Sequence, residues 1–170
     1  MLEHAKREAL ATQDKTTLIG YEGMASNAYF EVLPVLILNQ KADFPFHGRN
    51  RRPPKDAVNA MLSFAYTLIA NDTSAALETV GLDPYVGFLH TLRPGRTSLA
   101  LDMMEELRAY LGDRFVLSLI NKRQITSKDF LFQGDNGVVM TDKGKKTFIS
   151  AWQARKREVI IHPYLNEKIE

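Results

Sequence analysis

The sequence of 170 residues contains no cysteine, which excludes disulfide frameworks and thiolate metal centres. It has no run of eighteen apolar residues and opens with the charged segment MLEHAKREAL, so we expect neither a transmembrane helix nor a secretion signal. Glycine-rich phosphate loops, nucleophile elbows and internal repeats are also absent. The formal net charge of +2 is too small to indicate DNA binding by itself. These absences predict a cytoplasmic protein whose function depends on local clusters of residues.

The composition is that of a globular domain, with 45% hydrophobic and 25% charged residues. Apolar residues at helical spacing predict helices near residues 1–10, 16–33, 56–80, 98–120 and 142–157, the fourth of which either continues to Ile120 or breaks near Gly112. We expect N-caps at Thr16 or Thr17, at Asp56 and at Asp142. Short apolar runs flank a turn at Asn136-Gly137. We therefore predict a mainly α, multi-helix domain with one small β-hairpin near residues 130–140.

The stretch from Gly87 to Arg108 combines an imidazole with several carboxylates. His90 precedes a predicted helix on which Asp102, Glu105 and Glu106 share a face. Carboxylate oxygens and an imidazole nitrogen suit Mg or Mn. Apolar residues occur all round this helix, so we expect protein to enclose it. The alternative, which spacing alone leaves open, is a solvated acidic surface.

A further acid, Glu22, falls on the same face of the second helix as Leu18, Ala25, Tyr29 and Leu33. This pattern predicts that Glu22 points inward, either as a metal ligand or as a buried, hydrogen-bonded carboxylate. Gly20 and Gly23 beside it each cost about 1 kcal/mol in a helix interior, which close approach of another backbone would explain.

Basic residues gather in a proline-containing loop and in a second turn. The candidate phosphate contacts are Arg49, Arg51, Arg52, Lys55, Arg93 and Arg96. Arginine can fork onto phosphate oxygens, whereas a loop that only improves solubility has no need of arginine over lysine. A plain soluble linker remains the alternative for the loop. Asn59, just after it, serves either DNA or a helix cap.

Several segments in this order resemble the CRISPR-associated integrase that inserts new spacers, the first of the two universal adaptation proteins. The similarity is carried by GYEGMASNAYFEVL from Gly20, RNRRPPKDAVNAMLSFAYTLI from Arg49, GLDPYVGFLH from Gly81 and RPGRTSLALDMMEELR from Arg93. The resemblance implies that residues 1–170 form a single helical catalytic domain. It also implies a fragment that lacks the family's N-terminal β-rich domain and its C-terminal end.

The resemblance assigns roles to four acidic or imidazole side chains. It implies that Glu22, His90 and Glu105 bind Mg or Mn in the catalytic site. It adds Asp102 as a fourth catalytic residue, acting as a ligand, as support for a ligand or as a proton acceptor.

The implied function is a metal-dependent DNA endonuclease and integrase of CRISPR adaptation. It would join prespacer 3′-hydroxyl ends to the CRISPR repeat by phosphoryl transfer. The implied partners are double-stranded DNA and the second, smaller adaptation protein, with a homodimer in the full-length protein and no membrane. The competing hypothesis is a non-catalytic DNA-binding or assembly module whose acids only neutralise arginines.

Overall fold

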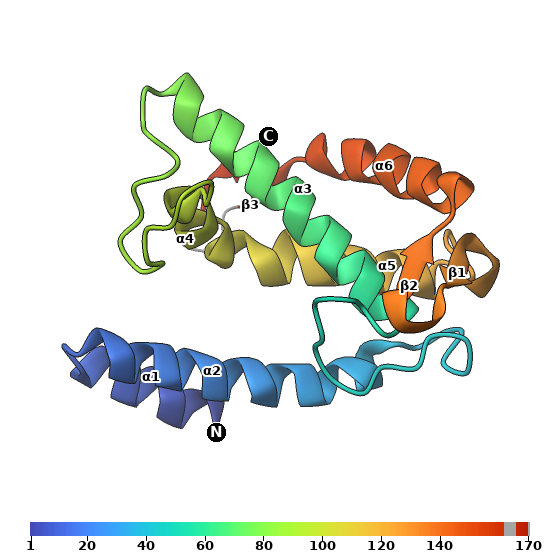
Figure 1. The fold of residues 1–170 in the computed structure, drawn as a ribbon, viewed down its shortest axis with the longest axis horizontal. Helices are drawn as coiled ribbons and strands as arrows, with labels where there is room; N and C mark the ends of the chain where they lie inside the picture. Colours follow the sequence, from blue (N-terminus) through green and yellow to red (C-terminus); the bar gives the residue numbers. More distant parts are fainter. Residues whose placement is uncertain (162–165, 170) are drawn as a thin grey trace.

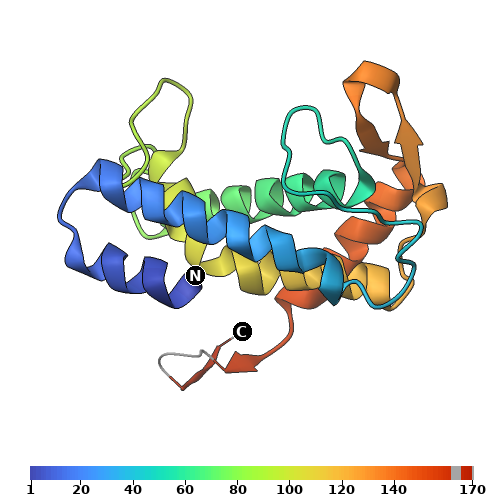
Figure 2. The ribbon, with the colours of Figure 1, turned by 90° about the horizontal axis from the view of Figure 1, so that it is seen from below.

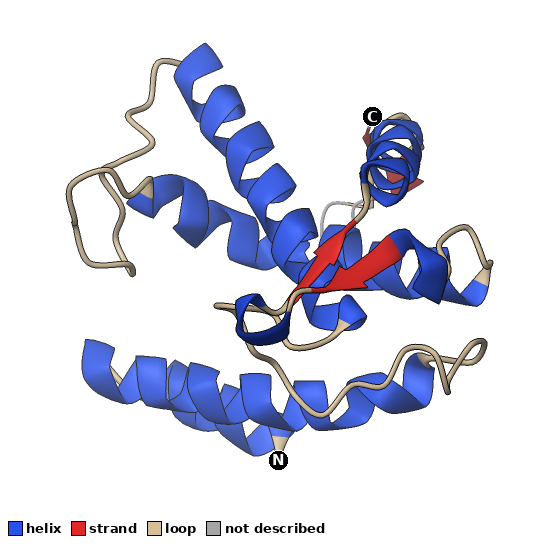
Figure 3. Ribbon diagram, turned by 45° about the vertical axis from the view of Figure 1, so that its right-hand side comes forward, coloured by secondary structure: helices blue, strands red, loops and turns tan. Residues whose placement is uncertain are grey.

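The computed structural model describes residues 1–161 and 166–169, and it confirms a mainly α architecture (Figures 1 and 3). The helices are α1 (Leu2–Ala11), α2 (Lys15–Val32), α3 (Ala57–Thr79), α4 (Ser98–Leu107), α5 (Arg114–Asn121) and α6 (Asp142–Lys156). The predicted hairpin is present as β1 (Phe130–Phe132) paired antiparallel with β2 (Val138–Met140). A second antiparallel pair, β3 (Ile160–Ile161) with β4 (Lys168–Ile169), was not predicted. No helix among the described residues is both long and apolar enough to cross a membrane.

The helix starts follow from local hydrogen bonds. Asp56 caps α3 as predicted, because its carboxylate accepts a 2.7 Å bond from the backbone N–H of Asn59. The other two predicted caps are each one or more residues too late. Asp14 caps α2 through the N–H of Thr17, and Thr141 caps α6 through the N–H of Gly144.

The acidic helix does not break at Gly112. Instead α4 continues through a π-helical segment, Arg108–Asp113, into α5. Gly112 packs against Tyr66 of α3, where an added Cβ would lie 2.9 Å from the ring carbon Cε1. Glycine therefore allows the ring to contact the helix backbone directly.

The core lies between α3, α5 and α6. One face of α3 is buried, including Met61, Ala65 and Ile69. Phe115 of α5 makes edge-to-face contacts with Phe148 and Trp152 of α6 at centroid distances of 5.1 and 5.3 Å. The core fixes α3 as a rigid base beneath two loops. Figure 2 shows that the chain segments around residues 45–56 and 87–97 project from the same side of the molecule as the β1–β2 hairpin.

The α1–α2 pair lies along one side of the molecule, and here the expected inward orientation of Glu22 was wrong (Figures 1 and 2). Glu22 is exposed, and of the predicted inward stripe only Leu33 is buried. The first half of α2 packs on α1 rather than on the core, so an acid at this position stays in water. A Cβ at Gly20 or Gly23 would meet no atom within 4 Å, so the expected close backbone approach is also missing.

Candidate nucleic-acid cleft and active site

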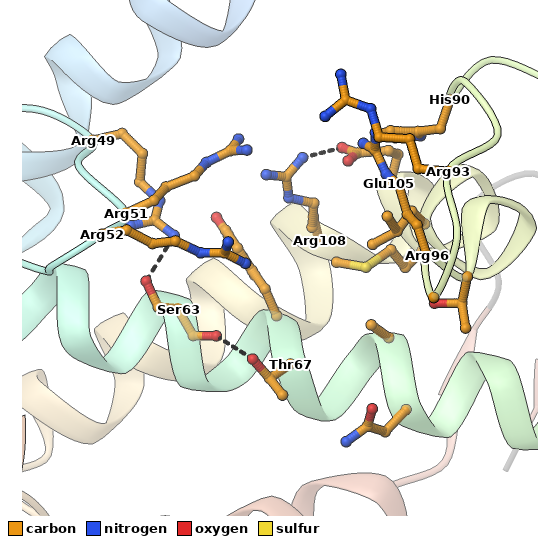
Figure 4. Close-up of a pocket in the computed structure, with 17 residues that line it drawn as sticks. Arg49, Arg51, Arg52, Ser63, Thr67, His90, Arg93, Arg96, Glu105 and Arg108 are labelled. Carbon is orange, nitrogen blue, oxygen red and sulfur yellow. Dashed lines mark hydrogen bonds and ion pairs between the residues drawn. The ribbon is translucent and has the colours of Figure 1, made fainter.

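A cavity of about 660 Å³, called here the arginine cleft, opens beside α3 between the two projecting loops. Its lining includes His90, Glu105 and six arginines: Arg49, Arg51, Arg52, Arg93, Arg96 and Arg108 (Figure 4). Five of the six predicted phosphate contacts therefore meet around two predicted catalytic residues. Lys55, the sixth, is exposed outside the cleft lining. Segments far apart in the sequence thus build one basic cavity.

Asp102 of α4 organises the loop that carries His90. Its Oδ2 accepts hydrogen bonds from the backbone N–H groups of Phe88 (2.7 Å) and Leu89 (2.9 Å). Its Oδ1 accepts bonds from the His90 backbone N–H (2.9 Å) and from the imidazole Nδ1 (2.6 Å). A Cβ at Gly87 would lie 2.6 Å from Asp102 Oδ2, so only glycine lets the loop wrap this closely round the carboxylate.

These contacts set the charge and orientation of the site. Burial favours the neutral form of Asp102, but hydrogen bonds from Leu89 and His90 outweigh it and hold the pKa of Asp102 below its usual value. An ionised carboxylate can only accept hydrogen bonds, so the His90 ring carries its proton on Nδ1 and donates that N–H to Asp102. The other ring nitrogen, Nε2, makes no hydrogen bond within the described chain, so it is available to a ligand or a proton. Of the three roles open for Asp102, this geometry corresponds to support for His90.

Glu105 lies on the cleft wall, one turn after Asp102. Its carboxylate accepts a hydrogen bond from Nη1 of Arg108. The expected enclosure of α4 by protein was wrong, because Met103, Glu106 and Leu107 are exposed. Apolar residues occur on all sides of α4 in the sequence, but the rest of the described chain covers only one side of the helix.

The predicted metal ligands are brought together only in part. His90 and Glu105 share the cleft, whereas Glu22 is exposed on α2 and does not line it. Within residues 1–161 and 166–169, no three His, Asp or Glu side chains form a group that could hold a metal ion. An imidazole with a carboxylate-bound Nδ1 and a nearby glutamate nevertheless suit Mg or Mn as donors. The cleft therefore offers two side chains, His90 and Glu105, whose donor atoms suit a Mg or Mn ion.

Asn59 shapes the basic loop. Its Oδ1 accepts bonds from Nη1 of Arg49 (2.8 Å) and the backbone N–H of Asn50 (3.0 Å). Its Nδ2 donates to the Gly48 carbonyl (3.0 Å) and to Oδ2 of Asp56 (2.7 Å). Asn59 is completely buried, so its role is to fasten the loop rather than to contact DNA.

Arg49 is turned inward. Its guanidinium donates to the Asn50 carbonyl, to Asn59 and to Ser63, and burial lowers its pKa. Arg49 therefore holds the loop in place, whereas Arg51 and Arg52 are exposed at the cleft. The hairpin supports the other side of this loop, because the N–H of Val138 donates to the Pro54 carbonyl over 2.8 Å.

Sequence reasoning did not find the contacts that link three residues at and beneath the cleft floor. Arg108 stacks on Tyr66 at the cleft, and the Tyr66 hydroxyl donates to Asp113, which is buried behind it. Tyr66 lies within an apolar helix pattern and Asp113 follows a glycine, so neither was expected to have a polar role. The one available signal was a tyrosine hydroxyl within a stripe that is otherwise apolar, since a buried hydroxyl needs a partner.

Comparison with known proteins gives a consistent match. Residues 1–154 match the family model described as CRISPR associated protein Cas1. A protein from Chlorobaculum tepidum named CRISPR-associated endonuclease Cas1 1 is 53% identical over 92% of this chain and 46% of its own length. The chain spans about half the length of this relative and of a second, 51% identical one from Rhodospirillum rubrum.

Solved structures show the same fold. A Cas1 protein from Thermotoga maritima superposes with a TM-score of 0.86 at 31% identity, over 99% of this chain and 52% of that one. A casposase bound to integration product gives 0.80 at 26% identity, over 92% and 44%. A partial Cas6-RT-Cas1–Cas2 complex gives 0.82 at 27% identity, over 90% and 46%.

Proposed function

The chain belongs to the Cas1 family of CRISPR-associated proteins, and on that basis we propose that the arginine cleft is the active site of a DNA endonuclease and integrase. One observation carries the proposal. The cleft places His90, oriented by the buried Asp102, and Glu105 among arginines from two separate loops. The names of the relatives and of the integration-product complex support it.

The proposed reaction is phosphoryl transfer between DNA strands. A prespacer 3′-hydroxyl loses its proton to solvent as its oxygen forms a bond to phosphorus at the repeat boundary. The bond from phosphorus to the leaving 3′-oxygen breaks, and that oxygen takes up a proton, without a covalent protein intermediate. Arg51, Arg52, Arg93 and Arg96 hold the backbone phosphates in line. As the alternative to holding a metal ion, His90 can give a proton from Nε2 to the leaving oxygen, because the bond from Nδ1 to Asp102 fixes the ring. Water in place of the 3′-hydroxyl would give nuclease activity.

We further propose that the reaction needs Mg or Mn. His90 and Glu105 would hold the ion, with Glu22 as the third donor. When bound, such an ion polarises the scissile phosphate and stabilises the charge of the transition state. Because Glu22 is exposed on α2, this third ligand requires α2 to approach the cleft.

The proposed partners are DNA and a second adaptation protein. The proposal for DNA depends on the arginines of the cleft, and the match to a chain of a Cas6-RT-Cas1–Cas2 complex supports a Cas2 partner. We propose that the protein acts as a homodimer in the cytoplasm.

The ion pair between Glu105 and Arg108 favours the competing function, a non-catalytic DNA-binding or assembly module. Thermal melting with and without Mn separates the two. For a metal ligand, we expect Mn to stabilise the parent by about 2–3 kcal/mol at one hundred times its Kd, and Glu105→Ala to remove this gain. Glu106→Ala, an exposed neighbour, is the matched control and should keep it. A Glu105→Ala variant that melts earlier but still responds fully to Mn would support the module instead.

A further inference from the structure

Arg108 lies at the floor of the arginine cleft, between its two walls. It begins the π segment, its side chain is 16% exposed, and it lines the cavity. In Figure 4 its guanidinium lies between the arginines of the basic loop and Glu105. A DNA strand that contacts both walls of the cleft would therefore pass over the Arg108 guanidinium.

Tyr66 provides the surface on which Arg108 rests. The guanidinium carbon of Arg108 lies 4.5 Å from the centroid of the Tyr66 ring, a cation–π contact. The Tyr66 hydroxyl donates a 2.5 Å hydrogen bond to Oδ1 of Asp113, which is buried. Gly112 packs against the edge of the same ring. Tyr66 is thus fixed at its hydroxyl and along its edge, so its ring is a rigid platform.

The π segment explains how one short stretch contributes both groups. In an α-helix, residues five apart, such as Arg108 and Asp113, project from different faces. The wider π turn, which closes i to i+5 hydrogen bonds, brings such residues closer to one face. Arg108 can therefore stack on the Tyr66 ring while Asp113 binds its hydroxyl. π turns of this kind are frequent at functional sites.

Arg108 retains hydrogen-bonding capacity toward the cavity. A guanidinium carries five N–H donors, and Glu105 is the one carboxylate of the described chain that pairs with it. The remaining donors form a planar fork, which matches the oxygens of a phosphate. Because Glu105 already has its counter-charge in Arg108, the arginines of the two walls leave the cleft positive.

We propose that Arg108 binds the DNA backbone in the cleft, and that Tyr66, anchored by Asp113, is the positioning residue that presents its guanidinium. This inference rests on the proposed function, because it assumes that DNA occupies the cleft. It adds a phosphate contact between the two walls, next to the reacting centre.

The first test measures the affinity of branched DNA for Arg108→Ala between 50 and 200 mM salt, in EDTA. We expect an affinity loss of about tenfold and a salt slope smaller by about 1, as for one lost phosphate contact. The loss should persist in a Glu105→Gln background. If Arg108 only neutralises Glu105, the loss will vanish in that background, which would overturn the proposal. A parent that binds DNA without salt dependence would instead contradict the proposed function itself.

The second test addresses the platform. Tyr66→Leu should reproduce the DNA-binding loss of Arg108→Ala and add little to it in the double variant, whereas Tyr66→Phe, which keeps the ring, should lose less. A lower melting temperature with unchanged affinity and salt slope would show a purely structural role. Should Tyr66→Leu fail to fold, Arg108→Lys carries the test, because lysine keeps the charge but cannot stack as a plane. We expect a severalfold loss, and parental affinity would overturn the positioning role.

Discussion

Asp102→Ala is expected to reduce DNA cleavage and strand transfer by about 100-fold, a large effect for a residue that supports another. The carboxylate fixes the backbone of Phe88, Leu89 and His90 and also binds the imidazole. Without it, His90 loses both its position and its preferred tautomer. Leaving the three N–H groups unpaired should also lower the free energy of unfolding by about 2–4 kcal/mol. Single-turnover cleavage and urea unfolding measure the two effects.

The pH dependence of unfolding checks the charge of Asp102. Because the folded state lowers its pKa from the ordinary value of 3.8, its stabilising contribution is full above that value. The contribution is lost as the pH falls through the lower, folded pKa. Asp102→Asn, which keeps the size of the side chain, should therefore be less sensitive to acid than the parent. Parental activity and stability in Asp102→Ala would contradict the assigned role.

Simultaneous replacement of Arg51 and Arg52 by Ala should weaken DNA binding by about 10- to 100-fold and reduce the salt slope by about 2. Both side chains are exposed at the cleft, and the loop is held by Asn59 and Pro54, so the fold should survive. Titration of labelled branched DNA at several salt concentrations measures both quantities.

A matched control removes the same charge elsewhere. Lys143 and Lys146 are exposed on α6 and do not line the cleft. Their joint replacement by Ala should change DNA affinity much less than the loop variant does. If both pairs lower affinity equally, general charge rather than the cleft attracts DNA.

The sequence predicted most of the fold because the signals were local. Helical periodicity located every long helix, Asp56 was placed correctly as a cap, and Asn136-Gly137 marked the hairpin. Residue type and clustering, together with the family resemblance, selected His90, Glu105 and the arginines that line the cleft. The helices, the cap and the hairpin depend on interactions within a few residues, and the site residues were chosen by the chemistry of their side chains.

The failures concern contacts between distant segments. Periodicity shows which face of a helix is apolar but not what lies against it, so Glu22 was expected inside although it is exposed on the half of α2 that packs against α1. Arg49 was classed with Arg51 and Arg52, because only the structure reveals its bonds to Asn59 and Ser63. The Tyr66 platform needs a π turn, for which the sequence has no recognised signal.

The most direct measurement is strand transfer of a DNA 3′-hydroxyl end into branched DNA in Mn, comparing the parent with His90→Ala and Glu105→Ala. The cleft is proposed to supply both the DNA contacts and the reacting groups, so we predict products from the parent and a loss of about 10³-fold in each variant. DNA binding in EDTA should change little in His90→Ala, which separates chemistry from binding. Equal product formation by the parent and both variants would contradict the assignment of this cleft as the active site.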